Sequence, residues 1–293
     1  MNIKSTQSSV MLGILVMIIG MIILASTDAI SKYLTISFAV VQILWIRYMA
    51  FAAIGSFVVI KKYGLSGIRT NRPIAQIARA LILTGTNFMA VFTLSIMPMA
   101  DAHAILAISP LMVTVVSAPI LGEVICRQRW IAVAFGFIGV LIILRPGAGI
   151  FDPVALIPLV VALSFSTYTV LTKIISRDDP NETTLFYTGI VGLSSLTPIG
   201  PFFWSTPTPI EWFWLAVAAV LGSIAHVFII TALHLAPASI LQPFNYTMLV
   251  WATVLGFFVF GNLPDFWTVT GALVIVVSGL FAWYWESRPS SIS

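Results

Sequence analysis

Long apolar segments separated by short polar ones dominate the hydrophobic pattern of the chain. Ten of these segments are predicted to be helices, at residues 10–33, 39–60, 74–97, 100–121, 129–145, 153–174, 183–203, 210–234, 238–260 and 266–285. Most approach the roughly 20 mainly apolar residues that a helix needs to cross a bilayer. The pattern therefore predicts an all-α membrane protein with ten transmembrane helices, the first of them retained and not cleaved as a signal peptide.

The composition agrees with a chain that lies largely in lipid. Hydrophobic residues fill 59% of the 293 positions and charged residues only 8%, whereas soluble domains carry about 25% charged residues. The single cysteine, Cys126, excludes an intramolecular disulfide and a metal site built from several cysteines. The formal charge of +4 does not indicate nucleic acid, because the basic residues stand between the apolar segments. No cofactor or metal is expected.

The distribution of basic residues predicts an orientation. If the first residue lies in the cytoplasm, ten of the 14 Lys and Arg residues fall in cytoplasmic segments, and only Lys32 and Arg145 fall on the other side. Arg47 and Arg79 lie within predicted spans. Because short cytoplasmic loops carry an excess of Lys and Arg, both termini are expected on the cytoplasmic side.

The chain contains an internal repeat. A shift of 139 positions aligns residues 97–123 with residues 236–262 without a gap. Identical residues coincide at four positions, Pro98 with Pro237, Thr114 with Thr253, Val115 with Val254, and Gly122 with Gly261. Each copy contains five predicted spans, an odd number, so the second copy crosses the membrane in the opposite sense. The expected organisation is two inverted five-helix repeats, residues 1–147 and 148–293, with a substrate site near the midplane where they meet.

Polar residues recur at equivalent positions inside the spans of the two repeats. Asn87 falls on His226 at the same shift, and Lys32 falls on Lys173 at a shift of 141. A polar side chain at this depth is costly unless it faces protein or water. The recurrence therefore predicts one shared cavity lined by Asn87 and His226. The alternatives are a hydrogen bond that joins helices, for Asn87, and a buried core histidine, for His226.

Further candidates for substrate contact gather at the start of the ninth span. Gln242, Asn245 and Tyr246 are spaced i, i+3, i+4 and so share one face of a helix, with Phe244 nearby. Hydrogen-bonding side chains among aromatic ones suit a flat organic ligand with a polar edge. Tyr168 in the sixth span has the same character. The alternative for these residues is an interfacial belt of Tyr and Asn.

Four charged or titratable residues are candidates for coupling or gating. Arg47 and Asp28 lie at depths that differ by about 5 Å, close enough for an ion pair that acts either as a packing clamp or as a substrate or proton contact. Asp101 and His103 begin the fourth span, where burial would shift their titration toward neutral pH. Simple hydration of the end of the span is the alternative for Asp101 and His103.

Several motifs resemble a known family. They are Asp28-x-x-Ser31-Lys32, Arg47, the stretch from Pro98 through Pro110 to Gly122-Glu123, and Arg129-Trp130. These motifs resemble the EamA-type members of the drug/metabolite transporter superfamily. The second copy departs from the pattern, with Gly261-Asn262 where Gly-Glu is usual. The resemblance implies a secondary transporter of a small organic metabolite in a bacterial inner membrane, and not an enzyme.

A finer likeness is to bacterial importers of riboflavin or S-adenosylmethionine, through residues 100–104, Pro243-Phe244-x-Tyr246 and residues 260–265. Riboflavin is the preferred substrate, with its ring expected to stack on aromatic residues such as Phe244, Tyr246, Tyr168 or Phe92. The alternatives are S-adenosylmethionine uptake, amino-acid or drug export, a membrane-embedded enzyme, and a non-transporting assembly subunit. The expected partners are the substrate and the lipid bilayer, without nucleic acid; a homodimer fits the sequence as well as a monomer does.

Overall fold

The computed structural model describes residues 3–121, 127–145 and 156–286. These residues form helices and connecting turns, with no strand among them. Nine helical segments in the described part are long and apolar enough to cross a membrane. The helix α8 (Asn181–Leu196) supplies the remaining predicted span, although its 16 residues make it shorter than the others. The expectation of an all-α membrane protein built from ten spans is confirmed.

Each half of the chain contributes the helices of one repeat. The first half forms α1 (Ile3–Leu34), α2 (Val40–Tyr63), α3 (Pro73–Ile96), α4 (Met99–Leu106), α5 (Ser109–Leu121) and α6 (Arg127–Leu144). The second half forms α7 (Ile157–Ile175), α8, α9 (Pro209–Leu235), α10 (Ala238–Leu241), α11 (Thr247–Phe260) and α12 (Phe266–Glu286). The connections include the 3₁₀ segments η1 (Gly64–Ile68), η3 (Gly200–Phe203) and η4 (Gln242–Tyr246). The expected boundary between residues 147 and 148 lies outside the described residues, as do Cys126 and Gly122-Glu123.

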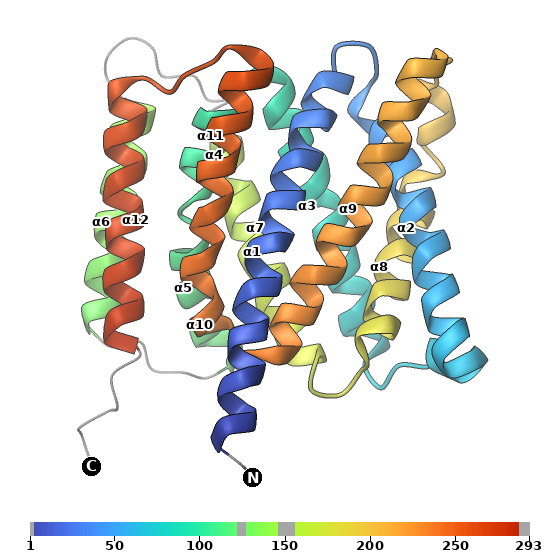
Figure 1. Cartoon of the computed structure of the whole chain (residues 1–293), viewed down its shortest axis with the longest axis horizontal. Coiled ribbons are helices and arrows are strands. Elements are labelled where there is room, and N and C mark those ends of the chain that lie inside the picture. The colour runs from blue at the N-terminus through green and yellow to red at the C-terminus, as the bar shows by residue number, and fades with distance from the viewer. Residues whose placement is uncertain (1–2, 122–126, 146–155, 287–293) are drawn as a thin grey trace.

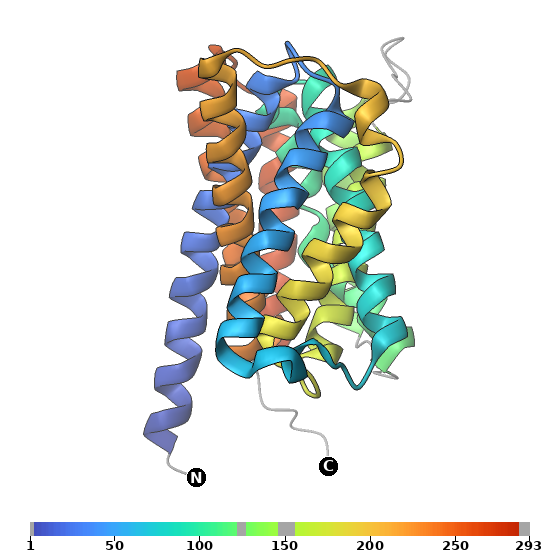
Figure 2. The same cartoon turned by 90° about the vertical axis from the view of Figure 1, so that its right-hand side faces the viewer.

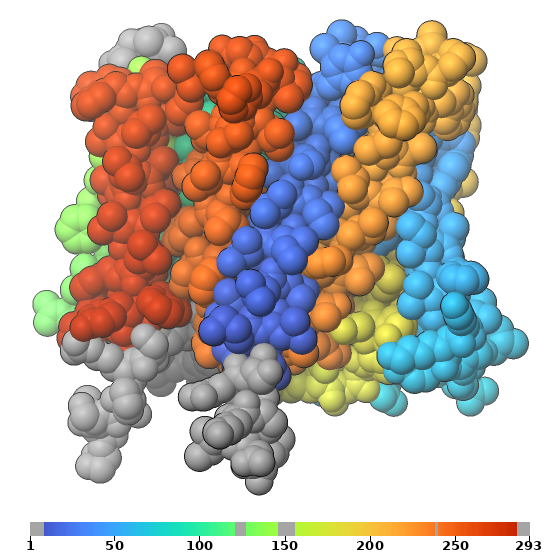
Figure 3. All heavy atoms as spheres, in the orientation of Figure 1, coloured from blue at the N-terminus to red at the C-terminus, as the bar shows by residue number. Residues whose placement is uncertain are grey.

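The two repeats interlock. The helix α1 packs along α9 and, equivalently, α7 packs along α3, while α2 packs against α8 and α6 against α12. Each of these pairings joins one repeat to the other. Figure 1 shows α6 beside α12 at one edge of the bundle and α2 beside α8 at the other, and Figure 3 shows α1, α9, α11 and α12 forming one face.

The two ends of the bundle differ in charge. The helix α1 begins and α12 ends at the same end, and in Figure 2 α1 extends beyond the other helices there. The ends of α2 and α7 and the start of α6 bring basic residues to this end, among them Lys61, Lys62, Arg129, Lys173 and Arg177. We call it the basic end and the other the opposite end.

Glycine residues set the closest crossings between the repeats. A Cβ atom on Gly139 of α6 would lie 2.7 Å from the carbonyl oxygen of Gly271 in α12, and one on Gly189 of α8 would lie 2.6 Å from the Cα of Ala52 in α2. Lipid tails are as apolar as Leu, so helices in a membrane associate mainly through close packing and interhelical hydrogen bonds. These contacts therefore hold the two repeats together.

Two predicted spans are interrupted. Between α4 and α5 the fourth span breaks at residues 107–108, and the ninth span begins as the short α10 and passes through η4 before α11 starts. Pro110 and Pro243 stand at these breaks, and a proline has no N–H with which to continue the helical ladder. Broken helices at corresponding places in two inverted repeats are typical of the binding regions of secondary transporters.

Candidate functional site

A central cavity of about 90 Å³ lies beside the two broken helices. The first repeat lines it with α1, α3, α4 and α5, and the second with α7, α9, η4 and α11. Its lining includes six of the residues singled out from the sequence, namely Asp28, Asn87, His103, His226, Asn245 and Tyr246. The fold therefore gathers these distant residues between the repeats; their role in binding or coupling stays a prediction.

His226 of α9 is the most isolated polar group of this cavity. It is 4% exposed, and neither ring nitrogen has a hydrogen-bond partner among the described residues. Its ring packs against Phe51 and Tyr168, with centroids 5.7 and 6.3 Å apart. Asn87, by contrast, donates from Nδ2 to Tyr48 Oη at 3.0 Å. Because an unpaired buried polar group is costly, His226 is suited to bind a ligand or water in the cavity.

The segment η4 supplies another polar wall. Asn245 donates from Nδ2 to Gln242 Oε1 at 2.9 Å, which corresponds to the eclipsed i and i+3 positions of a 3₁₀ helix. The expected α-helical face of Gln242, Asn245 and Tyr246 is thus replaced by a tighter turn. Asn245 Oδ1, Gln242 Nε2 and Tyr246 Oη have no partner in the described part of the chain. Gln242 lines a different cavity from the other two residues.

Asp28 pairs with His103. Their Oδ2 and Nε2 atoms lie 3.4 Å apart, and both residues line the central cavity. Arg47 donates from Nη1 to Ser31 Oγ at 3.2 Å, and Asp28 acts on it only as a nearby charge. The direct ion pair that the similar depths of Arg47 and Asp28 allow is therefore not formed within the described residues. Arg47 meets α1 at Ser31, one turn beyond Asp28.

The remaining predicted site residues lie outside the central cavity. Arg47 lines a small space of about 10 Å³ that also contacts Asn87 and His226. Tyr168 is fully buried behind the His226 ring. Asp101 is partly buried on α4 and lies near Thr268 of α12.

Two of the four stacking candidates, Phe244 and Phe92, do not reach the cavity. Phe244 packs into the apolar cluster formed mainly by α1 and α9, and Phe92 is 39% exposed on α3. Tyr246 of η4, a third candidate, lines the cavity, and so does Phe165 of α7, to which the sequence assigns no role. A rotation of one or two positions along a helix decides which ring faces inward, and apolar spans carry aromatic residues on every face.

Arg79 and Tyr48 are buried polar residues to which the sequence assigns no role. Arg79 is wholly buried, donates from Nη2 to the Thr184 carbonyl at 2.8 Å and to Thr188 Oγ1 at 2.5 Å, and lies 5.4 Å from the Tyr168 ring centroid. These contacts link α3 to α8 and α7. The only signal for Arg79 in the sequence is a charge within a span, and Tyr48 has no comparable signal.

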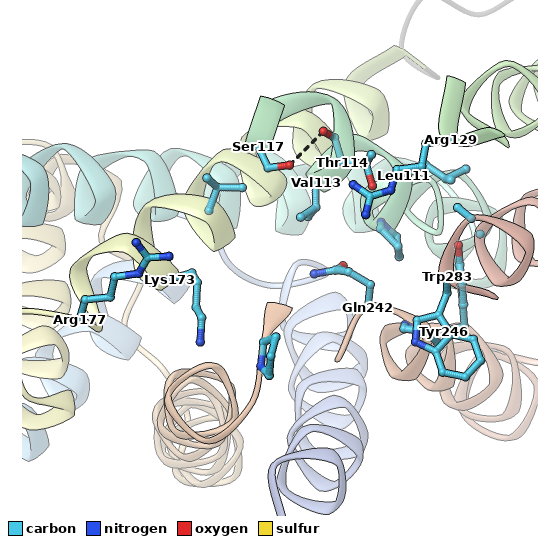
Figure 4. Close-up of a pocket in the computed structure, with 16 residues that line it drawn as sticks. Leu111, Val113, Thr114, Ser117, Arg129, Lys173, Arg177, Gln242, Tyr246 and Trp283 are labelled. Atoms are coloured by element: carbon cyan, nitrogen blue, oxygen red, sulfur yellow. Dashed lines mark hydrogen bonds between the residues drawn. The ribbon is translucent and has the colours of Figure 1, made fainter. Parts of the chain in front are cut away.

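A second cavity, which we call the vestibule, has a volume of about 190 Å³ and lies at the basic end. Figure 4 shows Arg129 on one side of it, Lys173 and Arg177 on the other, and Gln242 between them. Pro110 and Tyr246 line both the vestibule and the central cavity, so they separate the two.

The position of Tyr246 depends on a glycine in α12. A Cβ atom on Gly279 would lie 1.7 Å from Tyr246 Oη, far inside van der Waals contact. Only a residue without a side chain allows the phenol ring to lie against α12 in this way. The close approach of α12 therefore holds the ring between the central cavity and the vestibule.

Two lysines related by the repeat bind the ends of helices. Lys32 Nζ donates to the carbonyl oxygens of Leu94 and Met97, 2.5 and 2.8 Å away at the end of α3. The second repeat has the same arrangement at the end of α9, where Lys173 Nζ donates to Leu233 at 2.6 Å and Ala236 at 3.0 Å. The carbonyls of a last helical turn have no partner within the helix. The inverted repeat thus extends to individual hydrogen bonds.

Comparisons with known proteins agree with this architecture. The sequence profile described as the EamA-like transporter family matches residues 11–145 and 153–284. The S-adenosylmethionine uptake transporter of Rickettsia prowazekii (strain Madrid E) is 28% identical over 279 residues, which cover 95% of each chain. The riboflavin transporter of Vibrio cholerae is 33% identical over 198 residues, 66% of this chain and 65% of that one. A riboflavin transporter of Rhizobium johnstonii is 27% identical over 288 residues, 96% and 94% of the two chains.

A solved crystal structure shares the fold. It is 21% identical in sequence and superimposes with a TM-score of 0.64 over 94% of this chain and 96% of that one. The family profile matches once in each half of the sequence, and the two halves form the inverted repeats of the structure. This protein belongs to the EamA-like transporter family.

Proposed function

We propose that the protein carries a flat organic metabolite with polar edges across a bacterial inner membrane, and that riboflavin is its preferred substrate, taken up into the cell. The substrate occupies the central cavity, and access alternates as the interlocked repeats rock against each other. The basic end faces the cytoplasm, in keeping with the excess of Lys and Arg there. Relatives named as riboflavin and S-adenosylmethionine transporters support a small-molecule substrate.

The observation that carries this proposal is the set of unpaired polar atoms around one cavity. His226 Nδ1 and Nε2, Asn245 Oδ1 and Tyr246 Oη are buried without a protein partner in the described part, and all three residues line the central cavity. In folded proteins roughly 90% or more of buried backbone polar groups, and most buried side-chain polar atoms, are paired. A ligand with several donors and acceptors would satisfy these atoms. Riboflavin has ring carbonyls, a ring N–H and ribityl hydroxyls.

The charges around the cavity favour an uncharged ligand over a cation. Asp28 is the only carboxylate among its described lining residues, and His103 already pairs with it. Arg47 lies close to this cavity, because it lines the smaller space that Asn87 and His226 also line. A buried cation needs a free opposite charge. The described lining does not supply one to the positively charged sulfonium group of S-adenosylmethionine. S-adenosylmethionine is the second candidate, because a relative of that name matches 95% of the chain.

The Asp28–His103 pair is the coupling candidate within this proposal. A carboxylate and an imidazole 3.4 Å apart at a cavity wall form a unit that can take up and release a proton. Arg47, the unpaired His226 and Tyr246 are the other charged or titratable groups close by. Proton uptake at Asp28 would alter the charge that a substrate meets in the same cavity.

Counterflow in proteoliposomes tests the substrate. Vesicles loaded with unlabelled riboflavin should accumulate labelled riboflavin. The affinity for riboflavin should fall about tenfold or more in Asn87→Ala and in Tyr246→Ala, because each substitution leaves a ligand group unpaired at a cost of about 1–3 kcal/mol. Phe92→Ala is the matched control, since Phe92 lies on the surface of α3 outside both cavities. Counterflow of S-adenosylmethionine without riboflavin would contradict the preferred substrate. Unchanged affinity in both cavity variants, with lowered melting temperatures, would contradict the site.

A further inference from the structure

The vestibule is basic, and it is built by residues from separate helices. Arg129 lies in the first turn of α6, Lys173 lies in the last turn of α7 and Arg177 lies two residues beyond that helix, and all three line the vestibule. Among its described lining residues none is acidic. The repeat does not produce this cluster at the opposite end, because the counterparts of Arg129 and Arg177 are Thr268 and Ile36.

Among the described residues, backbone carbonyls and not a carboxylate meet the charge of Lys173. Its Nζ donates to two backbone carbonyls, and Arg177 lies near enough to repel it electrostatically. Like charges held together near a membrane interface are destabilising unless an anion or solvent screens them. An anion bound in the vestibule beside the end of α7 would therefore reduce the repulsion between Lys173 and Arg177.

The vestibule also has an aromatic wall. Trp283 of α12 and Tyr246 of η4 line it, and Figure 4 shows both on the same side of the cavity as Arg129. Aromatic rings suit a planar ligand, and Arg and Lys suit a phosphate, which accepts several charge-assisted hydrogen bonds at once. Both chemistries occur together in a phosphorylated aromatic metabolite.

We propose that the vestibule is a second binding site, separate from the central cavity, for a soluble aromatic metabolite that carries a phosphate group. The phosphate lies among Arg129, Lys173 and Arg177, and the ring lies against Trp283. Tyr246 separates this site from the central cavity. An occupant therefore blocks the route on the basic side and slows transport. The binding itself is independent of the transported substrate; only this effect on transport rests on the proposed function.

Matched pairs of ligands with and without phosphate test the binding. The probes are flavin mononucleotide against riboflavin and adenosine monophosphate against adenosine, added to the purified protein in nanodiscs of uncharged lipid. The phosphorylated member of each pair should bind more tightly, by about tenfold, and 0.5 M KCl should remove most of this difference through screening. The adenosine pair reports on the vestibule even if riboflavin is not the substrate, so the two proposals fail separately.

Two substitutions locate the site. Arg177→Gln and Arg129→Gln should each reduce the preference for the phosphorylated probe by about three- to tenfold, and together they should abolish it. Lys61→Gln is the control, because it removes the same charge from the basic end at an exposed residue outside the vestibule. The melting temperature of each variant checks that the protein is folded.

A lipid headgroup carries the same phosphate chemistry, so a second set of nanodiscs contains phosphatidylglycerol. Phosphatidylglycerol retained in native mass spectra and lost in Arg177→Gln, with no preference for the soluble phosphorylated probes in uncharged lipid, would overturn the proposal. Equal binding of both members of each pair, or an equal loss in Lys61→Gln, would also overturn it. A phosphate preference lost in the Arg variants and kept in Lys61→Gln supports it.

Discussion

Lys32 and Lys173 occupy equivalent positions in the two repeats and bind the same kind of acceptor, but their surroundings differ. Each donates to two carbonyls at the end of α3 or α9. Lys32, toward the opposite end, lies 5.6 Å from the Phe260 ring centroid. Lys173 borders the vestibule beside Arg177. The repeat thus fixes the backbone contact, and residues outside the repeat pattern decide whether the lysine meets an aromatic ring or an open, basic cavity.

This difference explains how two similar halves form a protein with unlike ends. A backbone carbonyl presents the same acceptor whatever its side chain, so the lysine contact survives sequence divergence between the repeats. The cavity lining depends on side chains, and these have diverged. The counterparts of Tyr246 and Gly279 at the shift of 139 are Ala107 and Val140. Only the second repeat therefore places a large ring between the central cavity and the basic end.

Replacing Lys32 and Lys173 one at a time should show how much the backbone contact and the surroundings of each lysine contribute to the free energy of unfolding. Lys32→Met leaves two carbonyls of α3 unpaired and should lower the free energy of unfolding by about 3 kcal/mol. Lys173→Met should cost less, because water in the vestibule can solvate the carbonyls of α9. Thermal unfolding in detergent measures both, and Lys→Arg at each site should recover most of the loss. A larger loss for Lys173→Met than for Lys32→Met would contradict the comparison.

Substituting Gly279 tests how Tyr246 is held. In Gly279→Ala the new Cβ would lie 1.7 Å from Tyr246 Oη, so the ring must move, at an expected cost of about 1–3 kcal/mol for an overpacked contact. The melting temperature should fall, and the second change Tyr246→Ala should restore it. Gly85→Ala is the control, because a Cβ there has nothing within 4 Å. A normal melting temperature in Gly279→Ala would show that α12 does not hold the ring.

The ion pair at the opposite end should have a small effect that depends on pH. Arg145 hydrogen bonds to Asp265, and this bond lowers the pKa of the Asp265 carboxyl to about 2, below an unperturbed value near 3.9. The stabilisation is therefore complete above about pH 4 and is lost as the pH falls toward 2. Asp265 is largely exposed, so the effect should be below about 1 kcal/mol. Melting temperatures between pH 6 and 3 should fall less in Asp265→Asn than in the parent protein.

Much of the architecture follows from the sequence, because the length of each apolar segment and the odd number of spans in each repeat can be read along the chain. The ten spans, the inverted repeat and the pairing of Lys32 with Lys173 require only counting along the chain. The equal depth of Asn87 and His226 also follows, since equivalent positions in inverted repeats lie at equal depths, whereas their meeting at one cavity depends on the fold. The helix breaks are harder to predict from the sequence, because Pro110 and Pro243 lie in apolar stretches that are long enough to span a membrane as unbroken helices.

Only the tertiary structure decides which side chains meet. The sequence permits Asp28 to pair with Arg47, whereas in the fold Asp28 pairs with His103 and Arg47 donates to Ser31. The tertiary structure also packs Phe244 within an apolar cluster and places Tyr246 on the lining of both cavities. A helix rotation of 100° per residue selects the face that each side chain occupies, and packing against the other repeat sets that rotation. The sequence therefore determines how deep each side chain lies in the membrane, whereas the packing of the two interlocked repeats determines the direction in which it points from its helix.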